Sequence, residues 1–503
     1  MKHIGFILLF SLITFYTVGM PVGGFVYLDT NHNGIKDANE KGIAGVCVSN
    51  GELVVKTDKN GRWSMETGNS NMVFLIKPVN YKVPVNKEMI PQFFHFTDKA
   101  DNGKIDFPLY NSPENPKFTA VFFGDPQARG LKEVNYINHD VVEELIGTSA
   151  SFGISLGDIT ADGPELFHEI NQGISQIGIP WYNTFGNHDY DRGSKTNDEA
   201  DNSYERIYGP STYAFEYGQV VFVDFNNIFF TQGKYKPHFT DTQISFLKNY
   251  LAFVPENKLV VLMMHAPIVA CDNRDKIFDL ISNRRFTFSV SGHVHEQINL
   301  FVNAEMGWKG SVPHHHLING TVCGSWWCGT IDETGIPHAT MNDGTPNGYS
   351  MIHFDGNTYS VQYKAARKPE NYQMNIYVKD DVIPAKEDTR QVLVNIFAGS
   401  PRSRVEMQIG GSGKWIAMSP FETADPECER MYELSPLLKE TVKGNVLEDI
   451  LGFTMDKPGN STHIWKGEIP PEITPGTYTL VVRTTDMYGK TWTSHRVFRV
   501  PEL

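Results

Sequence analysis

The 503-residue chain is poor in cysteine, has no excess of positive charge, and has no long apolar run beyond its first 20 residues. With 44 Lys and Arg against 58 Asp and Glu, its formal net charge is −14, so we expect no partner that binds through a nucleic-acid backbone. Because a membrane-spanning helix needs about 20 apolar residues, we expect no span after the first 20 residues. We also find no internal repeat and no low-complexity tract.

The cysteines are few and odd in number, which leaves at least one thiol unpaired. Cys323 and Cys328 are the only two that lie close in sequence. Either they form a disulfide or they are two buried free thiols, and both interpretations stay open. A zinc site there is disfavoured because four thiolate or imidazole ligands would be needed. The five cysteines are Cys47, Cys271, Cys323, Cys328 and Cys428.

The first residues have the pattern of a secretory signal peptide. Lys2 and His3 make a basic start, and an apolar run from Ile4 to Val18 follows. The run is too short for a membrane span, so it indicates an export signal, with an uncleaved anchor as the alternative. We therefore expect an exported protein, in the periplasm or outside the cell.

Polar motifs follow five apolar, β-rich runs between residues 118 and 295. Such runs predict buried strands, and residues just past the ends of several strands gather at one edge of a sheet, where open α/β sheets place their ligand sites. Carboxylate, amide and imidazole groups suit divalent metals that polarise phosphate and activate water. The motifs are Gly124-Asp125-Pro126-Gln127, Gly157-Asp158, Gly186-Asn187-His188-Asp189, His265, and Gly292-His293-Val294-His295. They predict a metal-dependent phosphoesterase.

Each of these residues has an ordinary structural explanation when taken alone. His265 after an apolar strand resembles a buried core histidine, and Asp125 or Asp158 could cap a following helix. His293 and His295 alternate and could be a surface pair. The kinds of side chain and their order together favour the metal site.

In this order the motifs resemble those of the calcineurin-like metallophosphoesterase family, over about residues 117–364. The second motif has the full Gly-Asp-x-x-x-x-Gly form, from Gly157 to Gly163. Purple acid phosphatases are a poorer match, since their Tyr ligand would fall at Ala161. The resemblance implies an α/β fold, in which a sandwich of β-sheets carries helices on the outside.

The resemblance also implies a role for each motif residue. Asp158 would bridge two metals, and a hydroxide held between them would attack phosphorus in a mono- or diester. His188 would be the general acid, and Asp189 would either orient His188 or cap the next segment. Asp125, Gln127 and His295 would complete the first metal site, and Asn187, His265 and His293 the second.

Gln127 departs from the family pattern, which usually has His at this position. An amide oxygen is a weaker ligand than imidazole and shifts the preference towards hard ions such as Mn²⁺, Mg²⁺ or Ca²⁺. Mn, Mg, Fe and Zn are the candidate metals. The alternative function is a surface ligand-binding protein with a degenerate phosphatase-like core. The enzyme is favoured because every other ligand position holds a competent residue.

The segment from Asp29 to Glu40 matches the EF-hand loop pattern at every fixed position. Residues 24–28 and 42–48 predict strands, so no helix flanks the loop. It is similar to the calcium loop of B-type modules in bacterial surface adhesins, which implies a structural calcium; a polar turn is the alternative. The ligand positions are Asp29, Asn31, Asn33, Ile35, Asp37 and Glu40.

Loops rich in Gly, His and aromatic residues follow the last motif, and we expect them to wall a substrate pocket. From about residue 369 onward, apolar and polar residues alternate and β-formers are frequent, a pattern typical of a β-sandwich. Residues 476–483 and 492–500 predict a hairpin. The expected pocket residues are His315, Trp326, Trp327 and Asp343.

The whole chain therefore predicts a catalytic domain between two β-sandwich domains. The expected boundaries are a signal peptide at 1–20, a prealbumin-like or B-type domain at 21–112, a metallophosphoesterase domain at 117–368, and a C-terminal β-rich domain at 369–503.

Overall fold

The computed structural model describes residues 21–68, 70–411, 413–444 and 455–502. The expected signal peptide lies outside these residues. In the described part of the chain, no helix combines the length and the apolar character that a membrane span requires.

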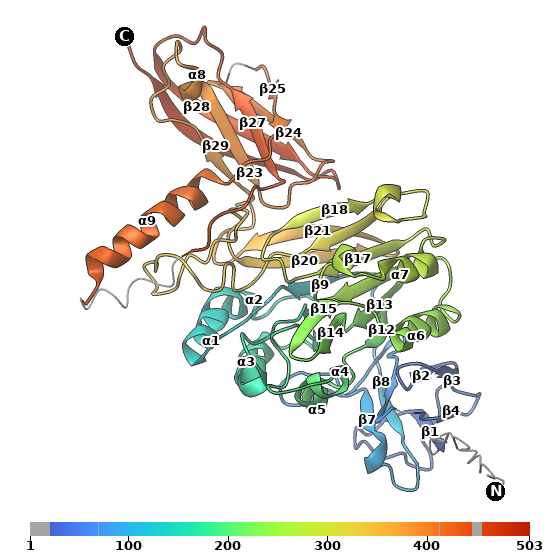
Figure 1. Cartoon of the computed structure of the whole chain (residues 1–503). Helices are drawn as coiled ribbons and strands as arrows, with labels where there is room; N and C mark the ends of the chain where they lie inside the picture. Colours follow the sequence, from blue (N-terminus) through green and yellow to red (C-terminus); the bar gives the residue numbers. More distant parts are fainter. Residues whose placement is uncertain (1–20, 69, 412, 445–454, 503) are drawn as a thin grey trace, which may run out of the picture.

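The N-terminal strands form two four-stranded sheets around one apolar core (Figure 1). In β4, Trp63 and Met65 are buried while their neighbours are exposed, as expected for a strand with one face on a core. The first sheet has the order β4 (Arg62–Glu66), β1 (Pro21–Leu28), β8 (Phe107–Asn111), β6 (Tyr81–Lys82). The second has the order β3 (Val54–Lys56), β2 (Cys47–Ser49), β5 (Met72–Leu75), β7 (Phe94–Phe96).

Two mixed sheets form the catalytic part. The first has the order β11 (Trp181–Asn183), β10 (Phe152–Ser155), β9 (Lys117–Phe123), β20 (Gly348–Asp355), β21 (Thr358–Ala365). The second has the order β12 (Tyr213–Tyr217), β13 (Val220–Phe225), β16 (Leu259–Met264), β17 (Thr287–Ser291), β19 (His314–Ile318), β18 (Ile298–Val302). Strands β9, β10 and β11 are parallel in the first sheet, and β13, β16, β17 and β19 are parallel in the second, so in each sheet their carboxyl ends lie at the same edge.

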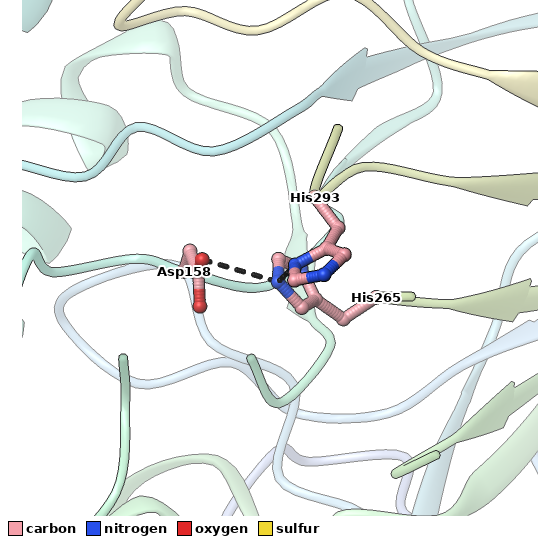
Figure 2. A group of neighbouring side chains, drawn as sticks. All are labelled: Asp158, His265 and His293. Atoms are coloured by element: carbon pink, nitrogen blue, oxygen red, sulfur yellow. Dashed lines mark hydrogen bonds and ion pairs between the residues drawn. The ribbon is translucent and has the colours of Figure 1, made fainter. Parts of the chain in front are cut away.

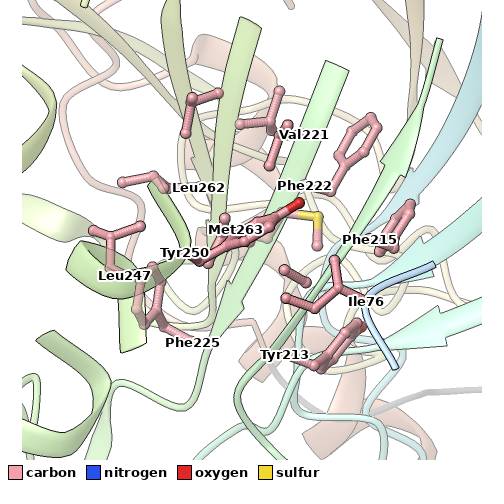
Figure 3. Close-up of a cluster of buried hydrophobic side chains, with 14 of the residues drawn as sticks. Ile76, Tyr213, Phe215, Val221, Phe222, Phe225, Leu247, Tyr250, Leu262 and Met263 are labelled. Carbon is pink, nitrogen blue, oxygen red and sulfur yellow. The ribbon is translucent and has the colours of Figure 1, made fainter. Parts of the chain in front are cut away.

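Helices lie outside the sheets, which confirms the predicted fold class (Figure 1). Every residue of β13 and β16 is buried, because sheet and helices cover both faces of these strands. Figure 3 shows Leu247 and Tyr250 of helix α6 (Asp241–Leu251) beside them, together with Ile76 from the N-terminal part. The helices are α1 (Leu131–Ile137), α2 (Glu143–Leu145), α3 (Phe167–Ile174), α4 (Asn197–Ala200), α5 (Asn202–Tyr208), α6 (Asp241–Leu251) and α7 (Arg274–Ile281). A short hairpin, β14 (Ile228–Thr231) and β15 (Lys234–Pro237), lies apart from both sheets.

The C-terminal part has two more four-stranded sheets around a separate apolar core. The predicted hairpin is confirmed, because β28 (Gly476–Thr485) and β29 (Thr491–Val500) pair antiparallel along their whole length. Helix α9 (Pro426–Val442), which we did not predict, starts at the capping residue Asp425. The remaining elements are β22 (Met374–Tyr377), α8 (Glu387–Arg390), β23 (Gln391–Ile396), β24 (Arg404–Ile409), β25 (Ile416–Ala417), β26 (Ser419–Pro420) and β27 (Ile464–Glu468).

A buried contact between His463 and Asp343 joins the C-terminal sheets to the catalytic part. His463 Nε2 lies 2.9 Å from Asp343 Oδ2, and both side chains are buried. The other ring nitrogen of His463 bonds Asn395 Oδ1 at 2.8 Å, and Asn395 donates to the Asp343 carbonyl oxygen. Asp343 also accepts the backbone N–H of Gln297, two residues past His295. The contact between His463 and Asp343, called the domain joint below, therefore stabilises the segment that follows the last metal-ligand motif.

We predict that His463→Ala destabilises the protein by about 3–5 kcal/mol, because it leaves the Asp343 carboxylate buried without its partner. Calorimetric or urea unfolding of the full chain measures this loss. The matched control is Arg499→Ala, which removes an exposed ion pair with Asp381 and should change stability little. Equal losses of stability in the two variants would contradict a stabilising role for the domain joint.

Candidate metal centre

The seven predicted ligands come together at the carboxyl ends of β9, β10, β11, β16 and β17. A chain of short contacts connects them, and six of the seven side chains are buried. The predicted ligands are Asp125 and Gln127 after β9, Asp158 after β10, Asn187 after β11, His265 after β16, and His293 and His295 after β17.

Asp158, His265 and His293 form the tightest group, with one ligand atom from each lying within 4.8 Å of the others (Figure 2). His265 Nε2 is 3.1 Å from Asp158 Oδ2, 3.0 Å from Asn187 Oδ1 and 3.2 Å from His293 Nδ1. His265 Nδ1 bonds the Leu156 carbonyl oxygen at 2.8 Å, which directs Nε2 into the group. These are the predicted ligands of the second metal.

Asp125, Gln127 and His295 lie beside this group. His295 Nε2 is 3.4 Å from Asp125 Oδ2, and its Nδ1 bonds the Gly324 carbonyl oxygen at 2.6 Å. The Gln127 amide nitrogen donates to Asp158 Oδ2 at 3.3 Å, so the amide oxygen faces Cys323 Sγ, 3.5 Å away. Since the two ends of an amide are assigned from their hydrogen bonds, Gln127 would act as an oxygen ligand with its amide reversed.

The backbone around the ligands adopts an unusual conformation. Five of the seven have positive φ: Asp125 (35°), Gln127 (45°), Asp158 (46°), His293 (76°) and His295 (56°). Each such non-glycine residue costs of order 1–3 kcal/mol, and such residues concentrate at functional sites. The strand-end loops are thus held in a conformation that only the surrounding structure maintains.

Two glycines of the motifs allow these loops to approach one another. A Cβ atom on Gly186 would lie 2.0 Å from the Asp158 backbone nitrogen. A Cβ atom on Gly292 would lie 2.2 Å from Asp125 Oδ1. Any larger residue would push these loops apart, which explains why a glycine directly precedes Asn187 and His293.

The electrostatics of the tight group favour an ion pair. Burial alone would raise the pKa of Asp158, but the neighbouring His265 lowers it to about 2. Burial opposes charge on His265, yet Asp158 raises the pKa of this histidine to about 9. Burial and the charge of His265 lower the pKa of His293 to about 4. A divalent cation bound here would take the place of the His265 proton.

His188 lies at the predicted position, beside the metal group. Its backbone N–H donates to Asp158 Oδ1 at 2.8 Å, and its side chain lines the recess in front of the centre. Its ring nitrogen Nδ1 has no hydrogen-bond partner among the described residues, and the nearest carboxylate, Asp162, lies 3.7 Å away.

Both interpretations of Asp189 were wrong. The side chain is fully buried and accepts the backbone N–H groups of Thr160 (3.1 Å) and Gly186 (2.9 Å). It therefore ties two motif loops together and neither orients His188 nor caps a later segment. Burial and the nearby Asp158 carboxylate raise the pKa of Asp189 to about 8.

A recess of about 190 Å³ opens in front of the centre. Of the four expected pocket residues only Trp326 lines it. Ser325 lies in one of the loops that we expected to wall the pocket, although it was not among the four named residues. Tyr235 and Asn342 were missed, because no motif marks them and Tyr235 comes from the β14–β15 hairpin. The recess is lined by Asp158, Asn187, His188, Tyr235, His293, Val294, His295, Ser325, Trp326 and Asn342.

The other three expected pocket residues serve the packing instead. The Trp327 indole is buried against Tyr136 and donates to the Pro126 carbonyl oxygen at 3.2 Å. His315 belongs to β19, where its ring nitrogens bond Tyr359 and Asn299. Asp343 is in the buried pair with His463.

The cysteines of the described chain are all free, so the interpretation of Cys323 and Cys328 as a disulfide was wrong. Cys323 is buried beside Gln127 and His295, whereas the Cys328 thiol donates to the Trp326 carbonyl oxygen.

Side chains of the predicted calcium loop form hydrogen bonds to the loop's own backbone and to one another. Asp29 is buried and accepts the N–H groups of His32 (2.7 Å) and Gly34 (2.9 Å). Glu40 accepts the N–H groups of Thr30 and Asp37, and thereby closes the loop. The amides of Asn31 and Asn33 both donate to Asp37. The oxygen atoms of the ligand pattern thus belong to one compact turn between β1 and β2.

The strand predicted at 42–48 is shorter, since only residues 47–49 form β2 and Gly42 makes an isolated bridge.

Comparison with known proteins agrees with this centre. Three family models match, described as the N terminal of Calcineurin-like phosphoesterase (residues 30–112), Calcineurin-like phosphoesterase (118–297) and the C terminal of Calcineurin-like phosphoesterase (316–492).

Curated relatives match only in part. Colossin-A of Dictyostelium discoideum is 40% identical over 70 residues, which are 13% of this chain and 1% of that protein. Serine-aspartate repeat-containing protein C of Staphylococcus aureus (strain Newman) is 30% identical over 152 residues, 25% of this chain and 16% of that protein. The chain thus spans a small share of the length of these relatives.

Among solved structures, a purple acid phosphatase from yellow lupin (Lupinus luteus) seeds aligns with 12% identity over 64% of this chain and 67% of that one. Its TM-score of 0.36 is too low to carry an argument. The family assignment rests on the three models, which follow one another along the chain, and on the motifs they contain. The chain belongs to the calcineurin-like phosphoesterase family.

Proposed function

We propose that this protein is an exported hydrolase of phosphate mono- or diesters that uses two divalent metal ions. The observation that carries the proposal is the convergence of seven ligand-type side chains from five strand ends on one centre, with four of the seven lining the recess in front of it. Membership of the calcineurin-like phosphoesterase family supports the reaction class, which is hydrolysis of a phosphate ester.

The residues present fit a pair of metals. Asp158 contacts both groups of ligands, since its Oδ2 atom lies near His265 and near the Gln127 amide. Asn187, His265 and His293 would hold one ion with it, and Asp125, Gln127 and His295 the other. When bound, such ions neutralise charge on the phosphoryl group and increase the acidity of water.

We assign the leaving-group proton to His188. The imidazole lines the recess next to Asp158, whose Oδ1 atom accepts the His188 backbone N–H, and the side chain is 24% exposed. In hydrolysis the bond from phosphorus to the ester oxygen breaks, and a proton donated to that oxygen lets it leave as an alcohol.

The second candidate is a binding protein that keeps the fold but not the chemistry. The observation in its favour is Gln127, whose amide oxygen faces Cys323 rather than Asp158. Metal analysis of the purified protein, followed by turnover of nitrophenyl mono- and diesters, separates the two candidates. Retained metal with metal-dependent turnover supports the hydrolase.

The proposal also includes export of the protein and a structural calcium ion in its N-terminal part. The basic start and the apolar run up to Val18 support export. The full ligand pattern from Asp29 to Glu40, together with the buried Asp29 carboxylate, supports a structural calcium ion that braces the connection after β1.

We expect Asp158→Asn to lose most of its bound metal and nearly all hydrolysis, because one carboxylate serves both ions. The fold should survive, since Asn keeps an oxygen that accepts the His188 N–H. Metal content and turnover are measured beside Asp241→Asn, an exposed aspartate on α6. Wild-type turnover in Asp158→Asn would remove this residue from the mechanism.

His188→Ala should keep its metal and slow hydrolysis about 10²–10⁴-fold. The loss should be larger for phenyl phosphate than for p-nitrophenyl phosphate, because nitrophenolate leaves without a proton. His168→Ala, at an exposed histidine on α3, is the control. An equal loss for both esters would count against proton donation.

In the full chain, Asp29→Ala with Glu40→Ala should abolish the rise in melting temperature that calcium produces, because a ligand of the folded state adds stability with its concentration. Turnover of a small ester should hardly change. Calorimetry with calcium and with chelator is the measurement, and the exposed pair Glu66→Ala with Asp98→Ala is the charge-matched control. A wild-type melting curve indifferent to calcium would restore the polar-turn interpretation.

A further inference from the structure

We infer that this centre selects phosphate esters whose leaving group is uncharged and carries an aromatic ring. The inference rests on the proposed function and names its substrate class. The recess holds about 190 Å³, less than the 300–1,000 Å³ or so of pockets that enclose a whole drug-sized ligand. The phosphoryl group therefore occupies the recess, and the leaving group extends along its border.

Trp326 forms one part of that border. Its indole stacks on His295 with ring centroids 5.5 Å apart and planes 18° apart, and it meets His188 edge-on at 5.0 Å. Its backbone has a φ of 57°, and its carbonyl oxygen accepts a bond from Arg129 at 2.6 Å. The indole is thus held in place beside the proposed proton donor, where the leaving group departs.

Tyr235 forms a second part of the border, next to a different ligand. It belongs to β15, its side chain is 41% exposed, and its ring meets His293 edge-on at 6.1 Å. Phe230 of the paired strand supports it, with ring centroids 6.0 Å apart. An exposed aromatic side chain that borders a polar recess offers a flat surface to a ligand.

The charges around the recess exclude leaving groups with a second anion. None of the ten described residues that line it is Lys or Arg. The polar pair Ser325 and Asn342 is engaged internally, because Ser325 Oγ donates to Asn342 Oδ1 at 3.0 Å. Arg129, which bonds the Trp326 carbonyl oxygen, is already paired with Glu133. A second phosphate or a carboxylate would therefore find no cation among the lining residues, whereas an uncharged ring would find two aromatic side chains.

The test compares benzyl phosphate with cyclohexylmethyl phosphate. Both release a primary alcohol of similar acidity and similar size, so only the aromatic character of the ring differs. We expect kcat/KM to be about 10-fold higher for the benzyl ester, the factor that one or two aromatic contacts supply. Trp326→Ala and Tyr235→Ala should each lower this ratio about 3-fold, mainly through KM, while Tyr235→Phe keeps it.

Calorimetric titration with the non-hydrolysable benzylphosphonate and cyclohexylmethylphosphonate gives a second readout, the ratio of their dissociation constants. This ratio does not depend on proton donation by His188. The same preference, and the same loss in the two alanine variants, is expected. Phe421→Ala, at an exposed aromatic residue of the C-terminal part, is the control and should leave the ratio unchanged.

A wild-type ratio near one, or a ratio that both alanine variants retain, overturns the inference while metal-dependent hydrolysis stands. Absence of hydrolysis of either ester by the metal-loaded wild type overturns the proposed function and this inference with it.

Discussion

The carboxylate of Asp158 is the contact on which the whole centre depends. Its Oδ2 atom lies 3.1 Å from His265 Nε2 and 3.3 Å from the Gln127 amide nitrogen, and its Oδ1 atom accepts the His188 N–H. One buried side chain thus connects loops from four strands. These contacts are possible only because Gly186, which has no side chain, allows the loop after β11 to lie against the Asp158 backbone. A charge so deeply buried is stable when partners surround it, which here are the imidazole and, in the proposed enzyme, metal ions.

The flanking parts of the chain hold this centre from both sides. The N-terminal strands share an apolar core with β13 and β16, and β16 ends directly before the ligand His265. The C-terminal sheets reach the site through His463 and Asp343, and Asp343 accepts the N–H of Gln297 beside the last ligand motif. The same segment carries Asn342 of the recess, whose carbonyl oxygen accepts the Gly459 N–H. The β-domains therefore belong to the architecture of the site.

The sequence predicted the centre better than its walls, for physical reasons. Ligands that follow parallel buried strands gather at the carboxyl ends of those strands, which is how motif order predicted the grouping of Asp125 with Asp158 and of His265 with His295. The expected single sheet edge was wrong, because these two groups come from two different sheets whose carboxyl ends meet at the centre. Pocket walls depend on which way each side chain turns. Trp326 and Trp327 are adjacent, yet one borders the recess and the other packs on Tyr136. Asp343 was misassigned because its partner lies 120 residues later, a distance that no local pattern reveals.

The most direct test of the account is the position of the metals themselves. Crystals of the full chain grown with Mn²⁺, with diffraction measured at the manganese absorption edge, locate the ions by their anomalous scattering. We predict two peaks, both within bonding distance of the Asp158 carboxylate, one also reached by His265 and His293 and the other by Asp125 and His295. A structure without anomalous density at Asp158, in which Asp158 still pairs with His265 alone, would contradict the account.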